Sequence, residues 1–176
     1  MLMNRLPEIT FHTRVRDRSI PGDNPFRWHD KTTTEIFAGK RSILFSLPAA
    51  FSPTCTDRHV PRYEELADEL NALGVDQIIC VSVNDAFVMY QWGKKVGVKQ
   101  IVLLPDGNGD FTRRMGMLID RSLFGMGMRS WRYSLLLNGL EIETAFVEDG
   151  IDSPNPEDPL NVSDADTMLA HLQSLA

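Results

Sequence analysis

The chain has 176 residues, 43% of them hydrophobic and 24% charged, which is typical of a folded globular protein with one compact core. A formal net charge of −6 argues against a nucleic-acid partner, because binding to phosphate backbones depends on clustered Lys and Arg. No apolar run is long enough to cross a bilayer, and residues 1–7 are too short and polar for a secretion signal. We therefore expect one domain over residues 1–176, with neither a membrane nor a nucleic acid as partner.

The first half of the chain alternates apolar runs with helical patterns. The run at residues 41–47 predicts a buried strand, and the apolar spacing over 55–73 predicts a long helix. Two further strands are predicted at 77–83 and 101–104, with a helix at 85–95 between them. This alternation predicts an α/β sheet that is covered by helices on both faces.

The second half of the chain predicts a β-hairpin. A short helix is expected near 110–115, and two strands are expected at 133–137 and 140–147. Between these strands, Asn138 and Gly139 suit the positive φ angles of a type I′ turn.

A loop and a final helix complete the predicted order of elements. The stretch at 148–159 is dense in Pro and Asp and predicts a loop. Ser163 and Asp166 resemble a capping box that opens a helix through residue 175. The predicted order is therefore βαβα followed by ββα.

The segment between the first strand and the first long helix puts Cys55 in the opening turn of that helix. Unpaired backbone N–H groups and the positive end of the helix dipole stabilise a thiolate there. Pro53 suits the first helical position, Ser52 can cap the helix, and Pro61 should kink it. The same local pattern also fits a buried structural cysteine with Ser52 as a cap only.

Pro48, Ser52 and Cys55 match the pattern Pro-x-x-x-Thr/Ser-x-x-Cys, and this segment resembles the active site of the peroxiredoxins, closest to the type-five subfamily. Three further stretches resemble the same subfamily in the same order, at residues 55–63, 81–88 and 131–134. The resemblance extends over about residues 7–175. It implies a thioredoxin-like α/β fold, in which helices flank a central mixed sheet.

The resemblance also implies a role for each matching residue. Cys55 would be the nucleophile that attacks the peroxide, Ser52 would offer its hydroxyl to the peroxide oxygens, and Pro48 would shield the thiolate from water. Arg132 would place a permanent cation beside the thiolate, with Arg129 as a weaker candidate. The implied enzyme is a thiol peroxidase, acting on hydrogen peroxide and alkyl hydroperoxides, that needs no metal or organic cofactor.

Regeneration of the cysteine is expected to depend on an external thiol. Some members of the family carry a resolving cysteine in the loop after the hairpin, but residues 148–159 contain none. Cys80 lies within an apolar run and is interpreted as inert core. We expect a one-cysteine cycle with glutathione, glutaredoxin or thioredoxin as reductant, on a chain without the fused glutaredoxin domain of some relatives. Free thiols fit a reducing, cytoplasmic location, and the resemblance suggests a homodimer.

Two alternatives remain open from the sequence. His59, one turn after Cys55, could act as the base of a cysteine-dependent hydrolase or transferase, although a histidine that packs the helix or contacts a loop is favoured. A non-enzymatic binding or holdase module on the same fold is the second alternative. The joint presence of Pro48, Ser52, Cys55 and Arg132 argues against it.

Overall fold

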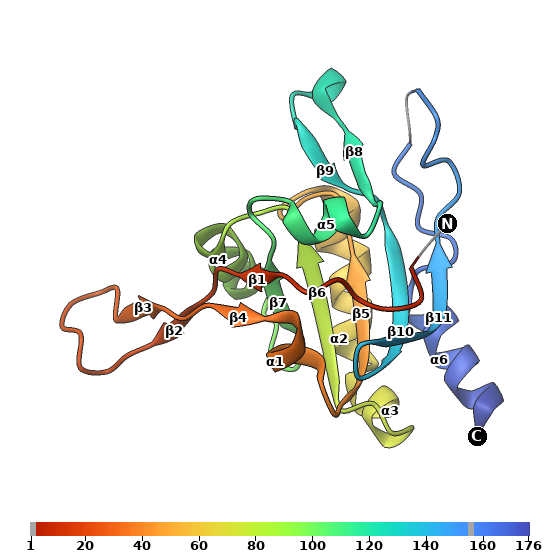
Figure 1. Ribbon diagram of the computed structural model, residues 1–176, viewed down its shortest axis with the longest axis horizontal. Helices are drawn as coiled ribbons and strands as arrows, with labels where there is room; N and C mark the ends of the chain where they lie inside the picture. The colour runs from red at the N-terminus through yellow and green to blue at the C-terminus, as the bar shows by residue number, and fades with distance from the viewer. Residues whose placement is uncertain (1–2, 155–156) are drawn as a thin grey trace.

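The structure is a computed structural model that describes residues 3–154 and 157–176. Its central sheet has the strand order β11–β10–β5–β6–β7 (Figure 1). The strands are β5 (Arg41–Ser46), β6 (Gln77–Ser82), β7 (Val102–Pro105), β10 (Tyr133–Asn138) and β11 (Glu141–Val147). Strands β5, β6 and β7 are parallel, whereas β10 runs antiparallel to both β5 and β11. The predicted mixed sheet is confirmed.

Helices cover both faces of this sheet, as the alternation of elements predicted. In Figure 1, α1 and α5 lie in front of the sheet, and α2 and α4 lie behind it. The helices are α1 (Thr33–Phe37), α2 (Val60–Glu65), α3 (Ala67–Ala72), α4 (Ala86–Val96), α5 (Asp110–Arg114) and α6 (Ala165–Leu175). No helix in the described part of the chain is long and apolar enough to span a membrane.

The two faces of the sheet bury separate apolar clusters. Ile43 and Phe45 of β5 pack with α2, α3, α4 and α6, whereas Leu44 packs on the other face with α1 and α5. Successive side chains of a strand point to opposite faces, so a continuous apolar run is what a strand between two layers requires. This explains why the apolar runs predicted the central strands correctly.

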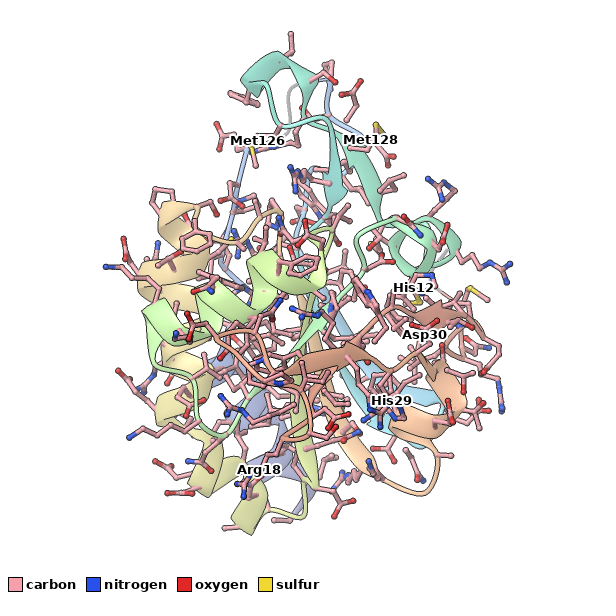
Figure 2. The ribbon with its side chains drawn as sticks, turned by 90° about the vertical axis from the view of Figure 1, so that its left-hand side faces the viewer. His12, Arg18, His29, Asp30, Met126 and Met128 are labelled. Carbon is pink, nitrogen blue, oxygen red and sulfur yellow. The ribbon has the colours of Figure 1, made fainter. Side chains whose placement is uncertain are left out.

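Short strand pairs at the periphery had no counterpart in the sequence-based prediction. They are β1 (Thr10–Phe11) with β4 (Lys31–Thr32), β2 (Arg14–Arg16) with β3 (Phe26–Trp28), and β8 (Leu118–Asp120) with β9 (Met128–Ser130). A short 3₁₀ helix, η2 (Ser122–Phe124), joins β8 to β9. The β8–β9 hairpin extends beyond the end of the sheet at which β5 and β6 finish, and it carries Met128 (Figures 1 and 2).

The helix predicted over residues 55–73 is not continuous. Helical residues start at Pro53, the π-helix η1 (Cys55–His59) follows, and the helix continues as α2 and breaks at Leu66 before α3. Pro61 lacks an N–H and its ring would clash with the carbonyl of Asp57, so an ordinary α-helical turn is disfavoured before it. The expected distortion at Pro61 therefore takes the form of a widened turn that contains Cys55.

Two local predictions are corrected by the structure. The hairpin pairs Asn138 with Glu141, so Asn138 ends the strand and only Gly139 takes a positive φ, of 58°, which is not a type I′ turn. The last helix is capped by Asp164, which accepts from the Thr167 N–H, and not by Ser163. The loop predicted at 148–159 is irregular where it is described, and Asn155 and Pro156 lie outside the described residues.

Truncation of Leu136 tests this account of the core. Leu136 lies on β10, opposite Ile43, and is fully buried. We expect Leu136→Ala to lower the free energy of unfolding by about 2–5 kcal/mol, because a cavity replaces the lost side chain. Leu175→Ala is the matched control, since Leu175 is 57% exposed, and we expect a change within about 0.5 kcal/mol. Equal losses in denaturant titrations would contradict the assignment of the core.

Candidate active site

Cys55 lies at the start of the π-helix, and its side chain is fully buried. The link from β5 to this helix contains Phe51, whose φ of 66° is the one positive value for a non-glycine residue among those described. Such a backbone conformation costs about 1 kcal/mol or more and persists only where the surroundings enforce it. The Asn84 side chain helps to hold this link, since it accepts from the Ala50 N–H at 3.0 Å.

Ser52 and Pro48 lie on the same link as Cys55. The Ser52 hydroxyl donates to the carbonyl oxygen of Ala49 at 2.9 Å, so the side-chain cap expected from Ser52 is replaced by a bond within the link. The Ser52 carbonyl accepts from the Thr56 N–H at 3.0 Å, and its side chain is half-buried. Pro48 is buried and is the second residue after the end of β5.

Arg132 is the charged group at the sulfur. It directly precedes β10, its side chain has no exposed surface, and its Nη2 lies 3.4 Å from Cys55 Sγ. Asp158 of the loop accepts from both Nε and Nη2 of the same guanidinium. Burial opposes the charge of Arg132, but the Cys55 sulfur and the Asp158 carboxylate outweigh it and raise the pKa of the guanidinium.

His59 contacts the third side of the Arg132 guanidinium. Its Nδ1 lies 2.8 Å from Arg132 Nη1, and its Nε2 lies 3.1 Å from the carbonyl oxygen of Ser163. Burial, followed by the charge of Arg132, lowers the pKa of His59 to about 3. Both ring nitrogens are therefore engaged by groups other than Cys55, which does not favour the interpretation of His59 as the base for a cysteine hydrolase.

Glu148 holds the segment that His59 contacts. Its Oε1 accepts from the N–H groups of Asn161, Val162 and Ser163, each at 2.9 Å, and from the Ser163 hydroxyl at 2.7 Å. Burial opposes its charge, but these donors together lower the pKa of Glu148. This carboxylate thereby fixes the Ser163 carbonyl, which accepts from Tyr63 as well as lying against His59.

Of the residues singled out in the sequence, the structure brings Cys55 and Arg132 into contact and places Pro48 and Ser52 on the adjoining link. Arg129 instead donates to the carbonyl oxygens of Val83, at 2.6 Å, and Met126, at 2.8 Å.

Asp158 and Glu148 were not predicted as members of the site. Both lie in the acidic stretch at residues 148–159, which predicts only a polar loop. Neither belongs to a motif that could have marked it as a site residue. The partners of Glu148 lie 13 to 15 residues away and that of Asp158 lies 26 residues away, beyond the reach of a local pattern.

Cys80 lies on β6, opposite Phe45 of β5, and is fully buried in the same apolar cluster as Cys55. Burial and the neighbouring Cys55 raise the pKa of the Cys80 thiol. A protonated, buried thiol is a poor nucleophile.

Within residues 3–154 and 157–176, no three His, Cys, Asp or Glu side chains gather as a metal centre would require. His12 Nδ1 lies 3.0 Å from Asp30 Oδ2 in the links between the N-terminal strands, beside His29 (Figure 2).

Known proteins share this arrangement over nearly the whole chain. The family model described as Redoxin matches residues 29–169. A peroxiredoxin of Synechocystis sp. is 60% identical, over 98% of this chain and 92% of the relative. The chain belongs to the peroxiredoxins. This peroxiredoxin is therefore a thiol peroxidase, as the sequence motifs implied.

Two more relatives bear on the subfamily and the fold. The hybrid peroxiredoxin hyPrx5 of Haemophilus influenzae is 48% identical over 96% of this chain, which spans 64% of that longer protein. Reduced Prx3 of Vibrio vulnificus, solved in complex with hydrogen peroxide, is 38% identical with a TM-score of 0.81, over 98% of this chain and 96% of that one. The expected type-five relationship and thioredoxin-like fold are confirmed.

The neutral state of His59 predicts a pH dependence of stability. The folded protein binds a proton at His59 only near pH 3, whereas the unfolded chain binds it near pH 6.5. Between these values the unfolded state holds more protons, so stability falls as the pH falls, by up to about 1.4 kcal/mol per pH unit. The stabilisation from the neutral His59 is fully present above the pKa of the unfolded chain.

Denaturant titrations from about pH 7 to about pH 4 test this. We expect the free energy of unfolding to fall less steeply with falling pH for His59→Asn than for the wild type. Parallel slopes would contradict the assignment.

Proposed function

We propose that Cys55 is the cysteine that reduces the peroxide and that Arg132 activates it. The contact of 3.4 Å between Arg132 Nη2 and Cys55 Sγ carries this proposal. The Cys55 thiolate attacks one peroxide oxygen, an S–O bond forms, and the O–O bond breaks. The second oxygen departs with the bonding electrons and takes a proton, leaving as water or an alcohol, while Cys55 becomes a sulfenic acid.

Each neighbouring side chain has a role in this step. The Arg132 cation stabilises the thiolate and then the negative charge on the departing oxygen. The Ser52 hydroxyl, which now bonds Ala49, turns to the peroxide oxygens when peroxide binds. Pro48 covers the sulfur and keeps water from competing. The substrates are hydrogen peroxide and alkyl hydroperoxides, in keeping with the peroxide complex of the Vibrio vulnificus relative.

The sulfenic acid is reduced by an external thiol in a one-cysteine cycle. The sequence has only two cysteines, and burial keeps Cys80 protonated within the core. The reductant is glutathione, glutaredoxin or thioredoxin. Such thiols are maintained in a reducing compartment, so we place the protein in the cytoplasm.

A homodimer of single domains, each spanning residues 1–176, is the assembly we infer. Large apolar side chains that remain exposed on a globular protein often mark an interface. Here they include Phe51 of the active-site link together with Phe87, Leu123, Phe124 and Met128, each 48% or more exposed.

Replacement of each cysteine tests the catalytic assignment. We expect Cys55→Ser to abolish peroxide turnover, because a hydroxyl is not ionised at neutral pH. Cys80→Ser should retain most of the activity and lose about 1–3 kcal/mol of stability, because it buries a hydroxyl in an apolar cluster. Activity assays with glutathione plus glutaredoxin, and with thioredoxin, also identify the reductant. Equal loss of activity in both folded variants would contradict the one-cysteine cycle.

Oxidation without a reductant tests the same cycle in one turnover. After one equivalent of hydrogen peroxide, intact mass analysis should show one added oxygen, since no internal thiol can resolve the sulfenic acid. Added glutathione should convert this species to a mixed disulfide, and excess peroxide should convert it to the sulfinic acid. A loss of two hydrogens, mapped to a Cys55–Cys80 bond, would mean that β6 opens and that Cys80 is not inert.

A further inference from the structure

Three side chains contact the Arg132 guanidinium, two from the π-helix and one from the loop. Nη2 faces Cys55 Sγ, Nε and Nη2 donate to Asp158, and Nη1 faces His59 Nδ1. A guanidinium is planar and rigid, so fixing one of its terminal nitrogens also fixes the position of the other. The partner of Nη1 therefore helps to determine where Nη2 lies relative to the sulfur.

His59 and Asp158 differ as supports for Arg132. Asp158 lies in the loop and its side chain is 27% exposed, whereas His59 is 1% exposed. His59 also lies in the same π-helix as Cys55. A contact from His59 thus connects Arg132 to the helical turn that holds the sulfur, independently of the loop.

The hydrogen bonds define the state of the His59 ring. A guanidinium has donors only, so His59 Nδ1 must accept from Arg132, and the ring proton lies on Nε2 and donates to the Ser163 carbonyl. A protonated ring would direct a second N–H against a cation. Arg132 and Tyr63 are the charged and titratable groups that contact the ring, and Cys55 and Asp158 are the other partners of that guanidinium. The cation beside Nδ1 therefore favours the ring as a neutral acceptor.

We propose that His59 is a positioning residue, whose neutral Nδ1 holds the Arg132 guanidinium in the orientation in which Nη2 faces the Cys55 sulfur. This inference rests on the proposed role of Arg132. A purely structural role is the alternative, because the His59 ring also packs against Phe45 and Tyr63, with ring centroids 4.8 Å and 5.6 Å away.

Two substitutions that remove the same aromatic packing distinguish the positioning role of His59 from a purely structural one. The side-chain oxygen in His59→Asn can occupy the place of Nδ1 and accept from Arg132. The amide nitrogen in His59→Gln can reach the place of Nε2 and donate to the Ser163 carbonyl instead. Both remove the aromatic ring, so both lose its packing against Phe45 and Tyr63.

The readouts are the pH midpoint of thiolate absorbance and the rate constant for hydrogen peroxide. We expect His59→Asn to react at least about tenfold faster than His59→Gln, and the thiolate midpoint of His59→Gln to lie about one pH unit higher. Equal values for both variants, or the reverse order, would overturn the inference.

Arg132→Met distinguishes the failure of this inference from the failure of the proposed function. If Arg132→Met changes neither readout, the proposed role of Arg132 is wrong. If Arg132→Met changes both while the two His59 variants behave alike, only the inference about His59 is overturned.

Nitrogen-15 spectra of the wild-type protein give a test that needs no stable His59→Gln variant. The His59 signals, assigned by their loss in His59→Asn, should show an unprotonated Nδ1 and a protonated Nε2, unchanged between about pH 8 and about pH 5. The opposite tautomer, or a doubly protonated ring, would overturn the inference.

Discussion

The buried contact between Arg132 and Cys55 is the constraint around which the active site is built. A guanidinium without exposed surface is stable only where hydrogen bonds and opposite charge compensate its lost hydration. The sulfur, Asp158 and His59 provide that compensation. The π-helix, the residue that precedes β10 and the C-terminal loop therefore converge on one cation, and Glu148 fixes Ser163, whose carbonyl contacts His59.

The sheet topology brings this cation to the sulfur. Strand β10 pairs antiparallel with β5, and Tyr133, the first residue of β10, lies opposite Ser46, the last residue of β5. Arg132 therefore lies at the edge of the sheet where β5 ends. The link that follows β5 leads directly into the helical segment that contains Cys55. Because β5 and β10 are both buried central strands, the positions of the nucleophile and the cation are determined by the core and not by a mobile surface loop.

The sequence predicts those parts of the molecule that depend on local pattern. The five central strands follow from apolar runs, and the positions of Cys55 and Arg132 follow from motifs. The paired strands of three residues near Arg14 and Trp28 are too short to show a periodicity from which they could be predicted.

Tertiary contacts decide the parts that the sequence did not predict. Ser163 matched a capping pattern, but its hydroxyl donates to Glu148, and Asp164 caps the helix instead. Asp158 had no local signal, since its role depends on Arg132 alone.

The most direct test of the account compares two reactions of Cys55 in the wild type and in Arg132→Met. Rate constants for hydrogen peroxide and for iodoacetamide would be measured at a pH where the thiol is ionised in both proteins. Arg132 stabilises charge on a departing oxygen, which only the peroxide reaction develops. We predict that Arg132→Met slows the peroxide reaction by about a hundredfold or more beyond its effect on alkylation. Equal slowing of both reactions would contradict it, and would reduce Arg132 to a residue that only stabilises the thiolate.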